Sequence, residues 1–417
     1  MAEIQPFRAY RYDTNRVALK DVLTQPYDKI TPAMQEQYYA ASPFNLITVE
    51  KGRISPNDSP ASNVYTRAAR TVDAWIAEKI LMQDSAPGIY IYAQEFLVPG
   101  THTRRGRLGF IALARVEDYD ARVVFRHERT LSGPKADRIE LLRHTRAQTG
   151  QLFLLYDDPA RRMDARLEEA ARKNPPVELC DEYGVTHRLW PVFEPAFIAQ
   201  IQNAMADQKL VIADGHHRYE TALNYRNECR ARDGQTDPLA ASEFAMATFI
   251  NTHSKGLTIL PTHRVVSRLA NFDFERFRAA LARYFDWYSY PFENSQERAA
   301  SYADFRKDFE NQHLGRRVIG VYPGAVHPGQ AFYLFVLRRN ADLADLLPDL
   351  SEAQRQLDVV LLHRLILEKG LGITAEAVAA EKNVGYEREA DAALDAVDRG
   401  EAQLALLLHP VRVEQVV

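Results

Sequence analysis

The chain has 417 residues, of which 46% are hydrophobic and 26% charged, a composition typical of a soluble globular protein that is too long for one core. Its 52 Lys and Arg against 56 Asp and Glu give a formal charge of −4, which argues against DNA as a partner. Two cysteines, no signal peptide and no apolar stretch of membrane-spanning length predict a cytoplasmic protein with no disulfide framework and no membrane partner.

The first third of the chain mixes helical and strand signals. Thr31 followed by Pro32 is typical of a helix N-cap with proline at the first helical position. The segments 88–98 and 107–119 alternate apolar and polar residues, and a Pro-Gly turn separates them. The alternation predicts an antiparallel hairpin in this region.

A strand-to-helix turn follows near the middle of the chain. The apolar run 211–213 predicts a short buried strand, and Tyr219, Ala222 and Leu223 have the spacing of one helix face. The polar cluster DGHHR (214–218) therefore lies on the turn between them. Such a turn points the first backbone N–H groups of the helix at a ligand, and an anion is stabilised there.

Two interpretations of this cluster remain open. For a phosphate ligand, Gly215 lets the phosphate approach the backbone, Arg218 forks onto its oxygens, and His216 and His217 donate further hydrogen bonds. Alternatively, Asp214 only caps the helix and the histidines lie on the surface. A metal bound through both histidines is disfavoured, because adjacent helical residues diverge by about 100°.

A second polar turn, RHERTLSGPKADR, spans 126–138. In a functional interpretation, Lys135 supplies a phosphate-binding charge and Glu128, next to His127 at a strand end, acts as a general base or Mg²⁺ ligand. An ordinary solvent-exposed turn before a helix explains the same residues. The spacing does not match a Walker sequence.

Two further motifs carry polar residues at the ends of predicted elements. PTHRVV (261–266) offers His263 and Arg264 as additional phosphate or nucleotide ligands at a strand end. QPYDKI (25–30) offers Tyr27 and Asp28, which on their own indicate a structural role.

The rest of the chain predicts a second unit. The segments EFAMATFIN (243–251) and LTIL (257–260) have strand character, and no further histidine-rich turn appears after residue 271. Beyond that point, a strand at 331–339 and a helix at 355–369 indicate a separate α/β unit. We therefore predict an N-terminal domain, 1–270, that carries the ADGHHR motif and the phosphate or nucleotide site, and a C-terminal α/β domain, 271–417. The fold class is α+β (mixed α/β).

The motifs QPYDKI, SPFNLITVE, RHERTLSGPKADR, IADGHHRYETAL, LPTHRVV and LDVVLLHRLIL together resemble the bacterial and archaeal family called domain of unknown function one-thousand-and-fifteen. The turn DGHHRYETA is also similar to the glycine-to-arginine box of the ParB and sulfiredoxin superfamily, which includes free serine kinases. That resemblance implies a ParB/sulfiredoxin-like core with large insertions, and a nucleotide whose phosphates are held by residues 215–218. Ser132 and Gln25 stand where the first family tends to have proline.

These observations lead to a first hypothesis for function. The protein would be a cytoplasmic enzyme that uses ATP or ADP with Mg²⁺ and transfers a phosphoryl group to a small hydroxylated metabolite such as free serine. Glu128, His127 and Asp214 are the candidate catalytic residues. The alternatives are a nucleotide-gated DNA-binding protein of ParB type, and a metal-dependent hydrolase that uses His127, Glu128 and one histidine of the pair.

Overall fold

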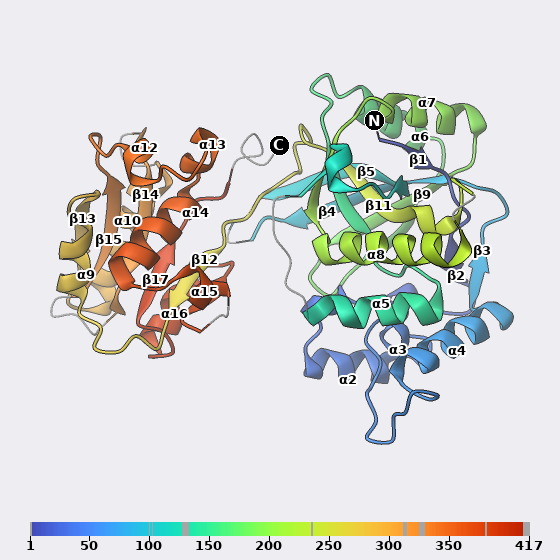
Figure 1. The fold of residues 1–417 in the computed structure, drawn as a ribbon, viewed down its shortest axis with the longest axis horizontal. Helices are drawn as coiled ribbons and strands as arrows, with labels where there is room; N and C mark the ends of the chain where they lie inside the picture. Colours follow the sequence, from blue (N-terminus) through green and yellow to red (C-terminus); the bar gives the residue numbers. More distant parts are fainter. Residues whose placement is uncertain are drawn as a thin grey trace. The chain divides into compact units, whose positions relative to one another are not determined.

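The computed structural model (Figure 1) divides into two compact units, residues 1–257 and 258–417. It describes residues 2–99, 101, 103–126, 133–234, 237–311, 315–324, 330–379 and 382–411, except for the side chains of residues 133–135 and 379. The division after residue 257, rather than after residue 270, assigns His263 and Arg264 to the second unit.

The first unit is built on one mixed β-sheet. Its strands lie in the order β6-β10-β7-β11-β5-β4-β9-β8, and β1 pairs with the end of β5. Strand β7 is parallel to β11 and antiparallel to β10, and a hairpin joins β4 to β5. The strands are β1 (Ile4–Gln5), β4 (Ile89–Leu97), β5 (Arg104–Arg115), β6 (Val124–Phe125), β7 (Leu152–Tyr156), β8 (Val177–Cys180), β9 (Thr186–Val192), β10 (Leu210–Asp214) and β11 (Phe244–Asn251). A separate pair consists of β2 (Tyr10–Tyr12) and β3 (Leu81–Gln83).

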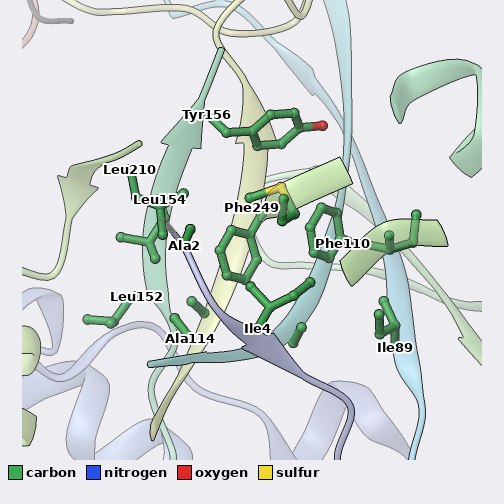
Figure 2. Close-up of a cluster of buried hydrophobic side chains, with 14 of the residues drawn as sticks. Ala2, Ile4, Ile89, Phe110, Ala114, Leu152, Leu154, Tyr156, Leu210 and Phe249 are labelled. Carbon is green, nitrogen blue, oxygen red and sulfur yellow. The ribbon is translucent and has the colours of Figure 1, made fainter. Parts of the chain in front are cut away.

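The core of this unit follows from the alternation of side chains along the central strands. Phe110 of β5 and Phe249 of β11 are paired across the sheet and stack with ring centroids 4.8 Å apart. Leu154 of β7 lies in the same buried cluster (Figure 2). Because side chains alternate between the two faces of a strand, every second residue of these strands points into this core.

Helices lie on both sides of the sheet. In Figure 1, α6 and α7 lie beyond the sheet from α8, α5 packs against α8, and α4 packs against α5. The helical segments are α1 (Leu19–Val22), η1 (Tyr27–Lys29), α2 (Pro32–Ala41), α3 (Ile47–Glu50), α4 (Val64–Ala77), η2 (Tyr119–Ala121), α5 (Gly133–Thr145), α6 (Arg162–Ala171), α7 (Pro195–Met205), α8 (His216–Asp233) and η3 (Ala241–Glu243).

Several local predictions are confirmed in this unit. Thr31 caps α2 by accepting a hydrogen bond from the Met34 N–H, and Pro32 is its first residue. The predicted hairpin is the β4–β5 pair, and the strand predicted from EFAMATFIN is β11. The strand predicted at 257–260 is wrong, since these residues form an irregular segment.

The second unit contains a six-stranded antiparallel sheet in the order β13-β15-β14-β17-β12-β16. Alternate residues of β15 enter two different apolar clusters: Phe335 faces one and Leu334 the other. The continuous apolar run of β15 is therefore explained by burial on both faces. The strands are β12 (His263–Val266), β13 (Phe285–Pro291), β14 (Val318–Tyr322), β15 (Ala331–Leu337), β16 (Val384–Glu387) and β17 (Leu404–Leu407).

Helices cover both faces of this second sheet. The α9 and π-helical η5 segments contribute to one apolar cluster, and α10 and α16 contribute to the other. The helical segments are α9 (Phe274–Leu281), α10 (Ser295–Glu310), α12 (Leu343–Leu346), α13 (Glu352–Arg355), α14 (Asp358–Leu361), η5 (Leu362–Gly370), α15 (Ala375–Ala379) and α16 (Ala390–Asp398). The two units together confirm a mixed α+β fold. Among the described residues, no helix has both the length and the apolar character needed to cross a bilayer.

Candidate functional site

The polar turn joins β10 to α8, as the sequence predicts. Strand β10 ends at Asp214, Gly215 has a φ of 91°, and α8 begins at His216. A φ in this range is left-handed and strains any residue with a Cβ atom. Glycine is therefore required at position 215 by the backbone alone.

Arg218 gives Gly215 a second reason to lack a side chain. A Cβ atom at Gly215 would lie 3.1 Å from the Arg218 Nε, and one at Gly150 would lie 3.4 Å from its Nη1. The guanidinium is thus held close to two glycine backbones. It donates hydrogen bonds to the Gln151 carbonyl and, at 2.5 Å, to Asp214 Oδ2. The Asp214 side chain is 69% exposed and that of Arg218 only 20%.

A buried carboxylate lies beside this arginine. Glu50, the last residue of α3, is 7% exposed and accepts hydrogen bonds from Thr149 Oγ1 and, at 3.3 Å, from Arg138 Nη1. A Cβ atom at Gly150 would contact both Glu50 and Arg218. A buried carboxylate is stable only when it is paired and hydrogen-bonded, and these contacts meet that requirement for Glu50. They also link α3, α5 and the turn into one polar network.

Tyr27, from the QPYDKI motif, belongs to the same network. The Arg138 guanidinium lies over its ring at 4.2 Å. Burial raises the pKa of the Tyr27 hydroxyl, and the positive charges of Arg138 and Arg218 partly oppose that rise. Lys51 fixes the adjacent backbone by donating hydrogen bonds to the carbonyls of Tyr27 and Ile30. Because its pKa is raised, the Tyr27 hydroxyl stays protonated at neutral pH and can donate a hydrogen bond.

Helices α5 and α8 run in the same direction past this network. Near their C-terminal ends, Arg143 of α5 pairs with Glu228 of α8, with an Nη2–Oε1 distance of 2.5 Å. Ten residues earlier on α8, Arg218 lies close to Gly150 and Glu50, and Glu50 pairs with Arg138 of α5. Arg138 precedes Arg143 along α5 just as Arg218 precedes Glu228 along α8, so the contacts follow the same order on both helices. Their N-termini therefore lie at the same end of the helix pair.

The second polar turn is described only in part. His127 and Glu128 lie outside the described residues, so nothing here tests their assignment. Lys135 lies in the first turn of α5, and its side chain is also outside the description. On the near side of the gap, Arg126 pairs with Glu220 of α8, with an Nη1–Oε1 distance of 3.5 Å. Both flanks of the segment 127–132 thus adjoin α8.

The two histidines of the turn differ in environment. His216 is 6% exposed and is part of the buried interior. His217 is partly exposed, and its Nδ1 is buried without a hydrogen-bond partner among the described residues. An unpaired buried nitrogen is unfavourable in the free protein. The ligand-binding role predicted for both residues stays a prediction.

His263 and Arg264 belong to β12 in the second unit, where both are buried. His263 Nδ1 accepts a hydrogen bond from the Leu408 N–H at 3.1 Å. Arg264 donates to the Thr262 carbonyl, and its guanidinium lies over the Tyr386 ring at 4.6 Å. These contacts support the β-sheet of that unit, and the phosphate-binding role assigned to both residues stays a prediction.

Sequence reasoning missed the residues of the polar network around Arg218. Glu50, Arg138, Thr149 and Gly150 were not predicted as site residues. Glu50 carries one usable signal, since it is a single acid that ends the otherwise apolar run of SPFNLITVE. Gly150 carries no such signal in the sequence, because glycine is favoured there by the close approach of the Arg218 side chain, which is distant in sequence. Within the described ranges, no cluster of three or more His, Cys, Asp or Glu could hold a metal ion.

Comparison with known proteins adds a family. No curated protein matches the chain. A conserved hypothetical protein from Pyrococcus furiosus has a similar solved structure, with 12% identity, a TM-score of 0.30, and coverage of 70% of this chain and 79% of that chain. A TM-score this low supports no inference about fold or function. The family described as "Protein of unknown function (DUF1015)" matches residues 4–360. The chain therefore belongs to the DUF1015 family.

Proposed function

We propose that the turn at Gly215 and the start of α5 bind the phosphates of ATP or ADP, with Mg²⁺, and that the protein phosphorylates a small hydroxylated metabolite such as free serine. The observation that carries the proposal is the common direction of α5 and α8, which puts both helix N-termini at the end of the pair where Gly215 lies. Backbone N–H groups at a helix N-terminus favour anions, and two such ends reinforce each other.

The side chains around this turn fit the same ligand. Arg218 uses two of its donors on Gln151 and Asp214, and a guanidinium has five. The Tyr27 hydroxyl and the unpaired His217 Nδ1 add polar groups nearby. Asp214 is mostly exposed, so its carboxylate can leave Arg218 when a phosphate arrives. The similarity of this turn to the ParB and sulfiredoxin box supports a nucleotide in particular.

The transfer step requires one base. The serine oxygen would attack the terminal phosphorus, the bond from that phosphorus to the nucleotide oxygen would break, and the serine proton would pass to a carboxylate. Asp214 and Glu128 are the proposed bases, with His127 beside Glu128. Lys135 in the first turn of α5 would neutralise the developing charge.

Isothermal titration calorimetry with ADP and Mg²⁺ tests the binding half. Arg218→Ala should weaken binding by about 2 kcal/mol, roughly 30-fold, because a charge-assisted contact is lost. Asp214→Asn should keep or strengthen binding, because the amide no longer competes for Arg218. Arg143→Ala is the matched control, since it removes an arginine at the far end of the same helix pair. Equal affinity in wild type and Arg218→Ala would end the assignment.

Incubation with ATP or ADP, Mg²⁺ and a pool of amino acids tests the transfer half. We expect a phosphorylated hydroxy amino acid in the wild type and none with Asp214→Asn or Glu128→Gln, whichever is the base. No phosphorylated product with any nucleotide, together with specific retention of DNA in a gel shift, would favour the DNA-binding alternative.

A further inference from the structure

A cavity lies elsewhere in the first unit, between α6 and α7. Its volume is about 450 Å³. Its polar lining comes from the end of β7 and the loop after it, from α6, from α7 and from the loop before β10: Tyr156, Asp158, Arg162, Arg166, Gln200, Asn203 and Gln208. Met163 and Ala204 supply an apolar wall. Small-molecule sites typically occupy a few hundred cubic ångströms and combine an apolar wall with a few polar groups.

The cavity is distinct from the turn at Gly215. Strands β7 and β10 are antiparallel, with Asp214 opposite Phe153 and Val211 opposite Leu155. Tyr156 follows Leu155, so it lies at the other end of the strand pair from Asp214. At about 3.3 Å per residue, the two ends are roughly 10 Å apart along the strands. In addition, α6 and α7 lie across the sheet from α8 (Figure 1).

The two arginines of the cavity make no ion pair among the residues that the structure describes. Arg162 and Arg166 are four residues apart on α6 and line the same space. Among the described residues, neither guanidinium makes an ion pair or a hydrogen bond to another side chain. The cavity's one acid, Asp158, accepts a hydrogen bond from the Met163 N–H at 2.8 Å. Two like charges at this spacing repel each other, and an anion between them removes the repulsion.

Tyr156 is independent evidence for a binding site. It is 1% exposed, and its hydroxyl is buried without a hydrogen-bond partner among the described residues. Figure 2 shows its side chain at the margin of the core that contains Phe110 and Phe249. Burial raises the pKa of this hydroxyl, and the negative charges of Asp164 and Asp158 raise it further, so it keeps its proton. A protonated, unpaired hydroxyl in a polar cavity wall is a donor that awaits an acceptor.

We propose that this cavity binds a small organic anion that carries a phosphate or a carboxylate group. Arg162 and Arg166 provide the positive charge, while Tyr156 and the amides of Gln200, Asn203 and Gln208 donate hydrogen bonds to its oxygens. The volume exceeds that of an inorganic phosphate, which leaves space against Met163 and Ala204 for a short carbon skeleton. The proposal does not depend on the function proposed for the turn.

Hydrogen–deuterium exchange with three probes, inorganic phosphate, glycerol 3-phosphate and succinate, tests the site in the full chain. We expect at least one probe to protect the backbone amides of 156–166 and 197–208, and the preferred probe separates a phosphate ligand from a carboxylate ligand. Protection confined to 211–223 would assign the anion to the turn and overturn the proposal. Absence of protection at about 10 mM of every probe would do the same.

Calorimetry with the protecting probe then assigns the residues. Arg166→Gln should weaken binding about tenfold, the loss expected for one charge-assisted hydrogen bond. Tyr156→Phe should weaken binding a few-fold and leave thermal stability unlowered, since the hydroxyl lacks a partner in the free protein. Arg172→Gln at the C-terminal end of α6 is the control, because it removes the same charge outside the cavity. Equal weakening by Arg172→Gln and Arg166→Gln would overturn the site.

Discussion

Two of the chain's His-Arg dipeptides, at 217–218 and 263–264, lie in opposite environments. Arg218 lies at the start of a helix, where Asp214 and the Gln151 carbonyl receive its hydrogen bonds. Arg264 lies in the middle of a sheet, between β16 and β17, and has no ion-pair partner among the described residues of its unit. The same dipeptide thus forms a partly buried cation paired with a carboxylate in one unit, and in the other a buried cation with no carboxylate partner among the described residues.

The difference shows that the neighbouring elements, and not the residue pair, decide what the charge does. Next to Gly215, the buried carboxylate of Glu50 is compensated by the hydrogen bonds that it accepts from Thr149 and Arg138. Next to Arg264, the surroundings instead keep histidines neutral. Burial, together with the charge of Arg264, lowers the pKa of both His263 and His363 to about 4. Four predictions test this contrast.

The largest effect is expected from removing the carboxylate of the first unit. Glu50→Gln removes the buried counter-charge of Arg138 and leaves it only the half-exposed Asp137, so the substitution should cost on the order of 3 kcal/mol of unfolding free energy. Urea denaturation measures it. The control is Glu36→Gln, which breaks an exposed pair with Arg53 and should cost less than about 0.5 kcal/mol. Similar losses in the two variants would remove the distinction between a buried and an exposed pair.

The second prediction concerns acid sensitivity of the second unit. The folded-state pKa of His263, about 4, lies below its ordinary value of 6.5, so the unfolded chain binds more protons between these two pH values. The stability is therefore fully present above pH 6.5 and is lost as pH falls toward 4, by roughly 3 kcal/mol for this residue. Urea midpoints across this range measure it. In His263→Asn the dependence should be shallower, and an unchanged slope would contradict the assignment.

The third prediction separates the two reasons for glycine at position 215. Gly215→Ala should destabilise the protein by about 2 kcal/mol, from the left-handed backbone and from contact with Arg218. Gly184→Ala is matched for the backbone, with a φ of 73°, and has no atom within 4 Å of the added Cβ. It should cost about 1 kcal/mol. In an Arg218→Ala background, the cost at Gly215 should fall to that of Gly184, and additive losses would refute the contact.

The smallest effect is expected from neutralising the buried arginine. Arg264→Met keeps an apolar side chain beside Tyr386 and removes the positive charge that disfavours protonated histidine. The pKa values of His263 and His363 should both rise, while burial keeps them below that of a free histidine. NMR titration of the imidazole protons measures both values. Unchanged values would leave burial as the sole cause.

Local sequence signals predicted much of the fold. The Thr31 cap, the β4–β5 hairpin, strand β11 and the β10–α8 turn were all predicted, because each depends on periodicity or on turn residues within a few positions. The 257–260 strand was not formed, since an apolar run of four residues needs a neighbouring strand to pair with. The family match over residues 4–360 also depends on the sequence alone.

The candidate site was predicted only as separate motifs. The sequence by itself determined the Gly215 turn, the positive helix end and the residue types around them. Only the tertiary structure decided that Glu50, Arg138 and Gly150 meet Arg218, that α5 begins beside α8, and that His263 and Arg264 are buried. The physical reason is that helix caps and strand periods depend on neighbours in sequence, whereas ion pairs and burial depend on which distant elements pack together.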